Sequence, residues 1–361
     1  MRLHKFVSIV FLAVCSMFAH ADGPSTAAKS YRAPHFDYFV GGDPSKPRAA
    51  HTEFGLALMG GGGSIDAAFR FLVERAGHGH IVVLRAADAN DPFDEPLGNY
   101  YGDLFVSQWG PVASVETISF RDREASSDPR VAKIIEGADG IFLAGGDQSR
   151  YVNFWKGTPV QRLLEAHVKA NRPIGGTSAG LAVLGHYVYS ALGGHSAESK
   201  IVLADPFDAS VTLESDFLHY RYMENIFTDT HFGKRHRLGR LITFLARLDA
   251  AKKHIAGIGI DEKTVLLVGA DGVGRLAEGS AGSAWIVQPQ KSATQLAAGK
   301  PLSMAGIRLT QFGADSRIDM KTRTVTKPVA EATISVIDGK LTAESIATPI
   351  FARDKPEPHE D

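Results

Sequence analysis

Apolar and polar residues follow two different rhythms along the first two thirds of the chain. Short, mostly apolar runs occupy residues 54–59, 81–84, 112–120 and 140–144. Apolar residues at helical spacing occupy residues 65–76 and 160–170. Short buried runs that alternate with amphipathic helices are typical of a parallel sheet with helices on both faces. We therefore predict an α/β fold with a mainly parallel sheet flanked by helices.

The pattern changes toward the C-terminus, where helical spacing fades. Strand-like runs appear there, separated by turn residues, at 265–268, 285–287, 307–309 and 334–336. We expect these extra strands to extend the sheet or to form a β-rich appendage. The sequence thus predicts one domain over residues 51–345 with a C-terminal β extension, and a flexible charged tail over residues 346–361.

The first 21 residues have the pattern of an export signal. Arg2 and Lys5 precede an apolar run over residues 6–18, and Ala19-His20-Ala21 is a small-x-small cleavage site. We expect a signal peptide over residues 1–21, an exported protein that is periplasmic or secreted, and no membrane segment after cleavage; a buried N-terminal helix is the alternative. Residues 22–50 are polar, contain prolines and show no clear period, so we interpret them as a leader.

Composition and charge exclude several classes of function. The 361 residues are 44% hydrophobic and 22% charged, and 39 Lys and Arg balance 40 Asp and Glu. This balance gives no basic excess that would favour nucleic acid or a membrane surface. Cys15 is the single cysteine and lies in the predicted signal, so thiol catalysis, disulfides and cysteine-ligated metals are not expected. Gly60-Gly61-Gly62-Gly63 resembles a phosphate-binding loop only loosely, because it lacks the full dinucleotide fingerprint.

The segment Gly176-Thr177-Ser178-Ala179-Gly180 matches G-x-S-x-G. It follows a short strand and precedes an apolar stretch that can begin a helix, which is the context of a nucleophile elbow. A sharp turn exposes the serine, and the amide of Ala179 with the helix N-terminus can stabilise an oxyanion. A glycine-rich turn without chemistry is an equally good interpretation of the pentapeptide alone.

Three further segments carry polar groups next to apolar runs. Gly145-Gly146-Asp147-Gln148 follows a strand, so the amide of Gly146 is a candidate second oxyanion donor and Gln148 a candidate substrate-positioning amide. Taken alone, this segment and the two described next are each also compatible with an ordinary turn or a solvated helix face.

The second of them, Asp229-Thr230-His231-Phe232, opens a basic amphipathic helix in which Arg235, Arg237 and Arg240 suit anionic substrate groups. His231 is a candidate general base, whereas His186, His195 and His219 lack a comparable polar cluster.

The third segment, Gly257-Ile258-Gly259-Ile260-Asp261-Glu262, ends in two carboxylates. Buried carboxylates need partners, so Asp261 or Glu262 is a candidate for the acid that orients the histidine.

In this order, the four segments resemble the cyanophycinase and aspartyl dipeptidase family of serine peptidases, over roughly residues 51–325. The resemblance implies a glutamine-amidotransferase-like α/β fold and no metal or organic cofactor. It implies Ser178 as nucleophile, His231 as base and Glu262 as the orienting acid. It also implies a set of substrate-binding residues: Gln148, Asp229, Arg235, Arg237 and Arg240.

The resemblance also implies a substrate class. The family substrate cyanophycin is a polyaspartate backbone with arginine joined to each side-chain carboxyl, and its cyanophycinases release β-Asp-Arg dipeptides. The arginine of such a substrate needs an acidic or aromatic counterpart, for which residues 88–103, with Tyr100 and Tyr101, are candidates. The export signal fits an enzyme that acts on external polymer.

Three hypotheses for function follow. The first is an exported serine exopeptidase that hydrolyses cyanophycin or another aspartyl substrate. The second is a periplasmic dipeptidase for aspartyl or isoaspartyl peptides. The third is a non-catalytic binding protein on an amidotransferase-like scaffold, which is disfavoured because Ser178, His231 and Glu262 are all present. The sequence leaves the oligomeric state open, a homodimer included.

Overall fold

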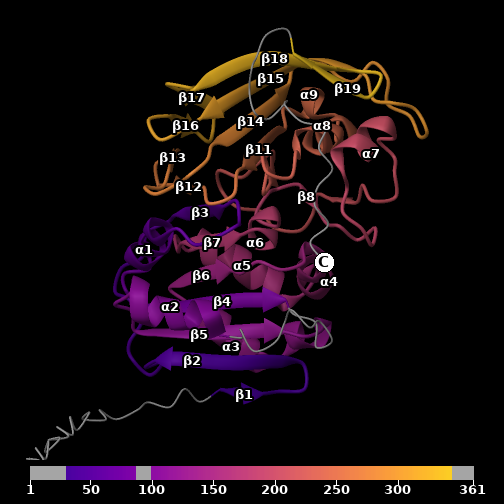
Figure 1. Cartoon of the computed structure of the whole chain (residues 1–361). Helices are drawn as coiled ribbons and strands as arrows, with labels where there is room; N and C mark the ends of the chain where they lie inside the picture. Colours follow the sequence, from indigo (N-terminus) through magenta and orange to yellow (C-terminus); the bar gives the residue numbers. More distant parts are fainter. Residues whose placement is uncertain (1–29, 87–98, 344–361) are drawn as a thin grey trace, which may run out of the picture.

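The computed structural model describes residues 30–86 and 99–343 (Figure 1). Within these residues the strands form a mixed sheet of 11 strands, a second sheet of 6 strands and a ribbon of 2 strands. In spatial order, the large sheet contains β1 (Tyr31–Arg32), β2 (Phe36–Gly42), β5 (Ser114–Phe120), β4 (His80–Ala86), β6 (Gly140–Leu143), β7 (Ile174–Thr177), β3 (Leu56–Met59), β12 (Val265–Val268), β13 (Val273–Leu276), β16 (Arg317–Asp319) and β17 (Thr324–Thr326). The second sheet contains β10 (Ile226–Asp229), β11 (Ala256–Ile260), β14 (Ala284–Pro289), β15 (Met304–Phe312), β18 (Ala330–Ile337) and β19 (Lys340–Ala343). The ribbon pairs β8 (Val188–Tyr189) with β9 (Leu213–Glu214).

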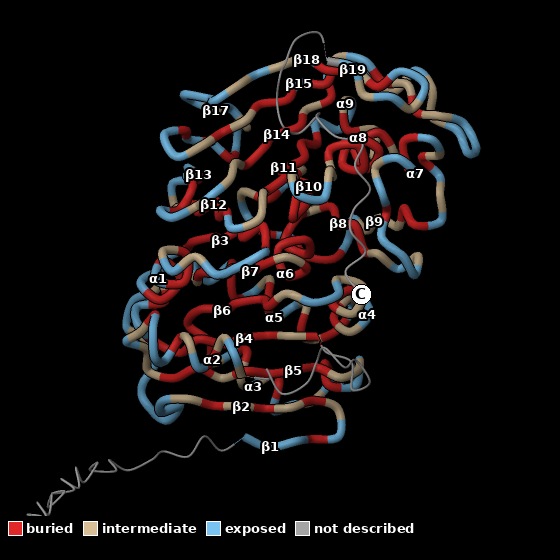
Figure 2. The backbone as a smooth tube through the Cα atoms, in the orientation of Figure 1, coloured by how far each residue is buried: buried red, intermediate tan, exposed pale blue. Residues whose placement is uncertain are grey.

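The centre of the large sheet is parallel, in the order β5, β4, β6, β7, β3. Strands β3, β6 and β7 are buried along their whole length (Figure 2). Parallel strands of this kind are covered on both faces, which explains why nearly all of their residues are apolar or glycine. Because parallel strands end at the same edge, the loops after β3, β6 and β7 meet there.

Helices cover both faces of this parallel centre. The described helices are α1 (Asp66–Arg75), α2 (Tyr100–Leu104), the π-helix η3 (Phe105–Trp109), the 3₁₀-helix η4 (Arg123–Ser127), α3 (Pro129–Gly137), α4 (Gln148–Trp155), α5 (Pro159–Lys169), α6 (Ala179–Ala182), α7 (Ser199–Ala204), α8 (Leu238–Arg247) and α9 (Ala250–Lys253). Side chains of β3 alternate between the faces: Ala57 and Met59 join a core with α1, whereas Leu56 and Leu58 join a core with α3 and α5. The result is a three-layer α/β/α arrangement.

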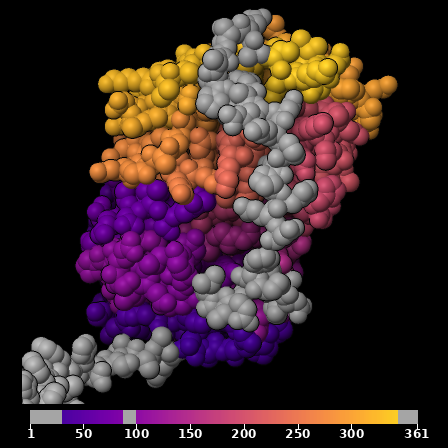
Figure 3. Space-filling model, in the orientation of Figure 1, coloured from indigo at the N-terminus to yellow at the C-terminus, as the bar shows by residue number. Residues whose placement is uncertain are grey.

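The second sheet packs against α8, and the chain passes between the two sheets several times. Phe227 of β10, Leu241 of α8 and Val287 of β14 share one apolar core. After β11, residues 261–264 lead into β12, which pairs antiparallel with β3 of the large sheet. Figure 3 shows the orange and yellow C-terminal strands packed directly on the indigo and magenta N-terminal part. The segment 261–264 therefore lies between the two sheets.

The predicted α/β fold with a mainly parallel sheet and late strands is confirmed. The late strands do both things that were expected of them. β12, β13, β16 and β17 extend the large sheet, and β14, β15, β18 and β19 belong to the second sheet.

The prediction of a leader over residues 22–50 is wrong for the described part of that stretch. β2 pairs antiparallel with β5, and Phe36, Tyr38 and Val40 on one face of it are buried. Their alternation with Asp37 and Phe39 is a strand pattern, which the surrounding prolines and glycines concealed. The domain therefore begins before residue 51. The predicted signal over residues 1–21 and the predicted tail over residues 346–361 lie outside the described residues.

None of the helices in the described parts of the chain combines the length and apolar character needed to cross a membrane.

Candidate active site

Ser178 occupies a strained turn between β7 and α6. Its φ of 51° and ψ of −118° place it in the positive-φ region that residues other than glycine seldom adopt. The turn is possible because Gly180 has no side chain: a Cβ there would lie 2.2 Å from the carbonyl oxygen of Leu143. The amide of Ser178 donates to the carbonyl of Met59 at 3.1 Å. The predicted nucleophile elbow is thus present in its geometry.

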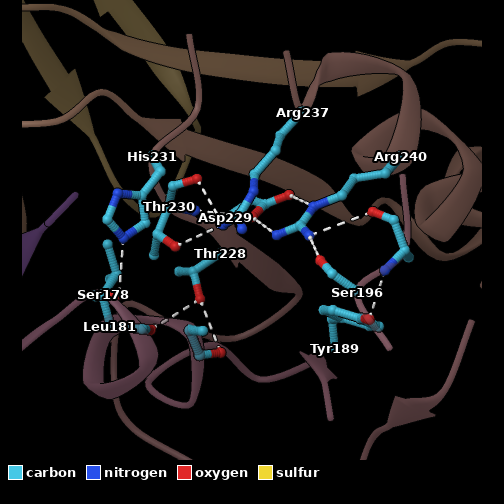
Figure 4. Close-up of polar contacts among 12 residues, drawn as sticks. Ser178, Leu181, Tyr189, Ser196, Thr228, Asp229, Thr230, His231, Arg237 and Arg240 are labelled. Atoms are coloured by element: carbon cyan, nitrogen blue, oxygen red, sulfur yellow. Dashed lines mark hydrogen bonds and ion pairs between the residues drawn. The ribbon is translucent and has the colours of Figure 1, made fainter. Parts of the chain in front are cut away.

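His231 lies two residues after the end of β10 and faces Ser178 (Figure 4). The Ser178 hydroxyl and His231 Nε2 are 2.8 Å apart. His231 also has a left-handed backbone, with φ of 46°, and its amide donates to the carbonyl of Gly60 at 2.9 Å. The histidine comes from the second sheet and the serine from the large sheet, so the packing of the two sheets sets this distance.

Glu262 completes a hydrogen-bonded chain from the segment between β11 and β12. Its Oε1 lies 2.7 Å from His231 Nδ1, and its Oε2 lies 3.3 Å from Lys234 Nζ. Burial acts to raise the pKa of Glu262, but His231 and Lys234 outweigh it and hold the pKa below its usual value. An ionised Glu262 keeps a proton on Nδ1, which leaves Nε2 as the acceptor for the serine hydroxyl.

The structure separates the two carboxylates that the sequence left as alternatives. Asp261 accepts from the amide of Gly233 at 2.9 Å and from the amide of Ser283 at 3.0 Å. It therefore fixes the turn that follows His231 and does not touch the imidazole. Burial raises the pKa of Asp261, against the lowering effect of these two amides.

The two candidate oxyanion donors flank the serine. Ala179 follows Ser178 directly, and a Cβ on Gly145 would lie 3.6 Å from the Cβ of Ser178, which places the loop of Gly146 beside it. Among the described residues, neither the amide of Gly146 nor that of Ala179 has an acceptor. α6 spans four residues only, so the local amides rather than a long helix dipole would stabilise an anion here.

The predicted substrate-binding residues fall into two groups. Gln148 is half-buried at the first residue of α4, and Arg235 is exposed. Arg237 is half-buried and donates to the carbonyl and the hydroxyl of Thr230, both at 3.0 Å.

The prediction that Asp229 and Arg240 contact substrate does not fit the structure. The two side chains are each 3% exposed and form an ion pair with each other. A buried, mutually satisfied pair offers no group to a molecule that arrives from solvent.

The four glycines after β3 form part of the site, which the sequence interpretation missed. A Cβ on Gly61 would lie 2.5 Å from Cε1 of His231, and one on Gly62 would lie 2.7 Å from Oε2 of Glu262. The loop therefore passes against the histidine and the glutamate at a distance that only glycine permits. The sequence did contain a signal for this loop, namely four consecutive glycines after a strand. These glycines were compared only with phosphate-binding loops and were not placed in the active site.

The remaining histidines considered above have other partners. His186 accepts from the amide of Asn225 and stacks on Tyr187, His219 contacts His186, and His195 lies 3.7 Å from Asp208. Within residues 30–86 and 99–343, no three His, Cys, Asp or Glu side chains gather as a metal site.

A pocket of about 210 Å³ opens beside Gly145. It is lined by Val83, Arg85, Tyr100, Tyr101, Thr117, Ala144 and Gly145. Burial raises the pKa of Tyr101 to about 12. Tyr100 and Tyr101 belong to the segment 88–103 that was expected to contact an arginine side chain; the part up to residue 98 lies outside the described residues.

Comparison with known proteins agrees with this geometry. The model of peptidase family S51 matches residues 113–275. The cyanophycinase of Trichormus variabilis is 32% identical over 216 residues, which cover 58% of this chain and 67% of that protein. The cyanophycinase of Geminocystis herdmanii is 30% identical over 232 residues, which cover 61% of this chain and 78% of that protein. The chain belongs to peptidase family S51.

A solved peptidase structure supports the fold. The crystal structure of a peptidase from an acI-B1 Actinobacterium has a TM-score of 0.50 and 18% sequence identity, and the match covers 75% of this chain and 98% of that chain. As a member of family S51, the protein is a serine peptidase, as the four sequence segments predicted.

Proposed function

We propose that this family S51 member is an exported peptidase that hydrolyses cyanophycin to β-Asp-Arg dipeptides through an ester on Ser178. The hydrogen-bonded chain from Ser178 through His231 to Glu262, with distances of 2.8 and 2.7 Å, supports the mechanism. The relatives named cyanophycinase support the substrate.

The proposed reaction has two steps. In the first, His231 Nε2 takes the hydroxyl proton as Ser178 Oγ bonds to the carbonyl carbon of the scissile amide, and the proton then passes to the leaving nitrogen. The amides of Gly146 and Ala179 would bind the oxyanion of the tetrahedral intermediate. In the second step, water gives a proton to Nε2 as its oxygen bonds to the ester carbonyl carbon. The bond from that carbon to Ser178 Oγ then breaks, Nε2 returns the proton to Oγ, and a free carboxylate leaves.

The charge at the rim of the site suits an aspartyl substrate. Lys234 and Arg235 come three and four residues after His231 and are both exposed. The guanidinium of Arg235 has no ion-pair partner among the described residues, whereas Lys234 Nζ lies beside Glu262. An exposed guanidinium next to the base can hold a substrate carboxylate through charge-assisted hydrogen bonds.

We expect Arg235→Ala to raise KM about tenfold with little change in kcat. A charge-assisted hydrogen bond is worth about 1.5–3 kcal/mol, and about 1.4 kcal/mol corresponds to a factor of ten. Steady-state kinetics on the polymer measures both parameters. Arg32→Ala, at an exposed arginine on the edge strand β1, is the matched control and should leave both unchanged. A kcat defect without a KM defect in Arg235→Ala would contradict substrate binding by this residue.

The pH dependence of kcat/KM should show a low acid limb. Burial lowers the pKa of His231 to about 4, opposed by Glu262 and assisted by Arg235 and Arg237. The imidazole accepts the serine proton only when neutral, so activity is present above this pKa and is lost as the pH falls through it. We expect the apparent pKa of kcat/KM well below the ordinary histidine value of about 6.5. An acid limb at or above that value, in protein shown by circular dichroism to be folded at the same pH, would contradict this environment for the base.

Mass spectrometry of products tests the substrate. Incubation with purified cyanophycin should release β-Asp-Arg, and a panel of α- and β-aspartyl dipeptides should be cleaved far more slowly. Rapid cleavage of the dipeptides with the polymer intact would instead identify an aspartyl or isoaspartyl dipeptidase. If neither the polymer nor the dipeptides are cleaved, the proposed activity is wrong.

Export is supported by the basic residues, apolar run and small-x-small site within residues 1–21. Expression of the full chain in a Gram-negative host, followed by N-terminal sequencing of the periplasmic and medium fractions, tests it. We expect a mature N-terminus at Asp22. An uncleaved protein in the cytoplasmic fraction would overturn export without affecting the catalytic proposal.

A further inference from the structure

A buried ion pair between Asp229 and Arg240 lies beside the segment that carries His231 (Figure 4). Arg240 Nε donates to Asp229 Oδ2 at 2.9 Å, and Arg240 Nη2 donates to Asp229 Oδ1 at 2.5 Å. This is a two-pronged contact between planar groups, which fixes the orientation as well as the distance of the partners. Asp229 is the last residue of β10, two residues before His231.

The ion pair is linked to the backbone of His231 through Thr230. Asp229 Oδ1 accepts from the amide of Thr230 at 2.8 Å, and Arg237 Nη1 donates to both oxygens of Thr230 at 3.0 Å. The polar groups of the residue before His231 are thus engaged by this network. His231 itself has a φ of 46°, a conformation that costs about 1–3 kcal/mol outside glycine and needs support from its surroundings.

The other side of Arg240 is closed by the segment before α7. Its Nη1 lies 3.3 Å from Ser196 Oγ and 3.4 Å from the carbonyl of Ala197, and its guanidinium carbon lies 5.1 Å from the ring centre of Tyr189. The amide of Ala197 in turn donates to the hydroxyl of Tyr189 at 2.8 Å. Arg240 is therefore enclosed by protein on both sides and turned away from solvent.

We propose that Asp229 and Arg240 are positioning residues, which hold the segment before His231 so that its imidazole stays aligned between Ser178 and Glu262. The proposal rests on the proposed role of His231 as base. It gives these two charged residues a different role from the substrate contact that the family resemblance implies. Arg235, five residues before Arg240 and exposed, is left as the candidate for the substrate carboxylate.

Arg240→Lys tests the proposal because lysine keeps the positive charge but cannot form the two parallel hydrogen bonds of the guanidinium to Asp229. The readouts are kcat, KM and the rate at which a fluorophosphonate labels Ser178. In labelling, the serine oxygen bonds to phosphorus, fluoride leaves and His231 takes the hydroxyl proton, so the rate reports on the base without any substrate. We expect kcat and the labelling rate to fall together by about tenfold, and KM to stay within about twofold of wild type.

Arg247→Lys is the matched control. Arg247 lies on the same helix, donates to the carbonyl of Pro206 and lies over the ring of Phe207. The Arg247→Lys variant should have the same labelling rate, kcat and KM as wild type. A raised KM with wild-type labelling in Arg240→Lys would overturn the proposal and return Arg240 to the substrate. Absence of labelling in the wild-type protein would instead count against the catalytic role of Ser178 and His231.

If Arg240→Lys does not fold, a double variant in which both residues are replaced by neutral ones tests the same proposal. Removing one partner of a buried pair leaves an unpaired charge, whereas removing both charges avoids that cost. Asp229→Asn combined with Arg240→Gln should fold, as judged by thermal unfolding, and label at least tenfold more slowly than wild type. Wild-type labelling in this folded double variant would refute a positioning role.

Discussion

Ser178→Ala should lower kcat for cyanophycin hydrolysis by about 10⁴-fold or more, while the protein keeps its fold. The hydroxyl is the group that would form the ester, and water activated by the remaining residues is a far weaker route. Among the described residues the hydroxyl has His231 as its hydrogen-bond partner, so its loss leaves the fold intact. The rate of β-Asp-Arg release, followed by mass spectrometry under saturating polymer, measures the effect.

Two further variants show whether Ser178 and His231 act as a unit. His231→Ala should cost about as much as Ser178→Ala, and the double variant should cost no more than either, because each removal already abolishes the same step. Ser107→Ala, at an exposed serine on η3, is the matched control and should retain full activity. Independent, additive losses in the double variant would show that the two side chains do not work in one chain of hydrogen bonds.

Local sequence patterns marked Ser178, His231 and Glu262 as candidates because each one lies one or two residues after a strand. The strands are buried and apolar, so each polar residue that ends one stands out in the sequence: Ser178 after β7, His231 after β10 and Glu262 after β11. The choice between Asp261 and Glu262 was beyond the residues themselves. That choice depends on the direction of each side chain in the segment 261–264, which leads from the second sheet to the large sheet.

The two misassigned residues and the missed strand have different physical causes. Asp229 and Arg240 are charged and close to His231 in sequence, which is compatible with substrate contact or with a buried ion pair. Only the packing of residues 189–197 over Arg240 decides between them. β2 was missed because its partner β5 is about 80 residues away, and the prolines and glycines around β2 concealed its alternation.

Gly61→Ala should lower kcat by about 10²-fold or more, with KM less affected. The new Cβ would lie 2.5 Å from Cε1 and 2.6 Å from Nε2 of His231, closer than atoms that are not bonded can approach. Either the glycine loop or the imidazole must move, and a displacement of about 1 Å in a catalytic group can cost about 10²-fold. Steady-state kinetics on cyanophycin and the fluorophosphonate labelling rate both report the change.

Gly63→Ala separates this effect from the strain that alanine causes in the loop. Gly61 and Gly63 both have positive φ, 94° and 146°, so both substitutions impose a backbone cost. A Cβ on Gly63 would meet Lys263 Cγ at 3.5 Å, an ordinary contact that does not involve His231 or Glu262. We therefore expect both variants to lose thermal stability and Gly61→Ala alone to lose most of its activity. Equal losses of kcat in the two variants would mean that the loop acts through its backbone and not through its contact with the base.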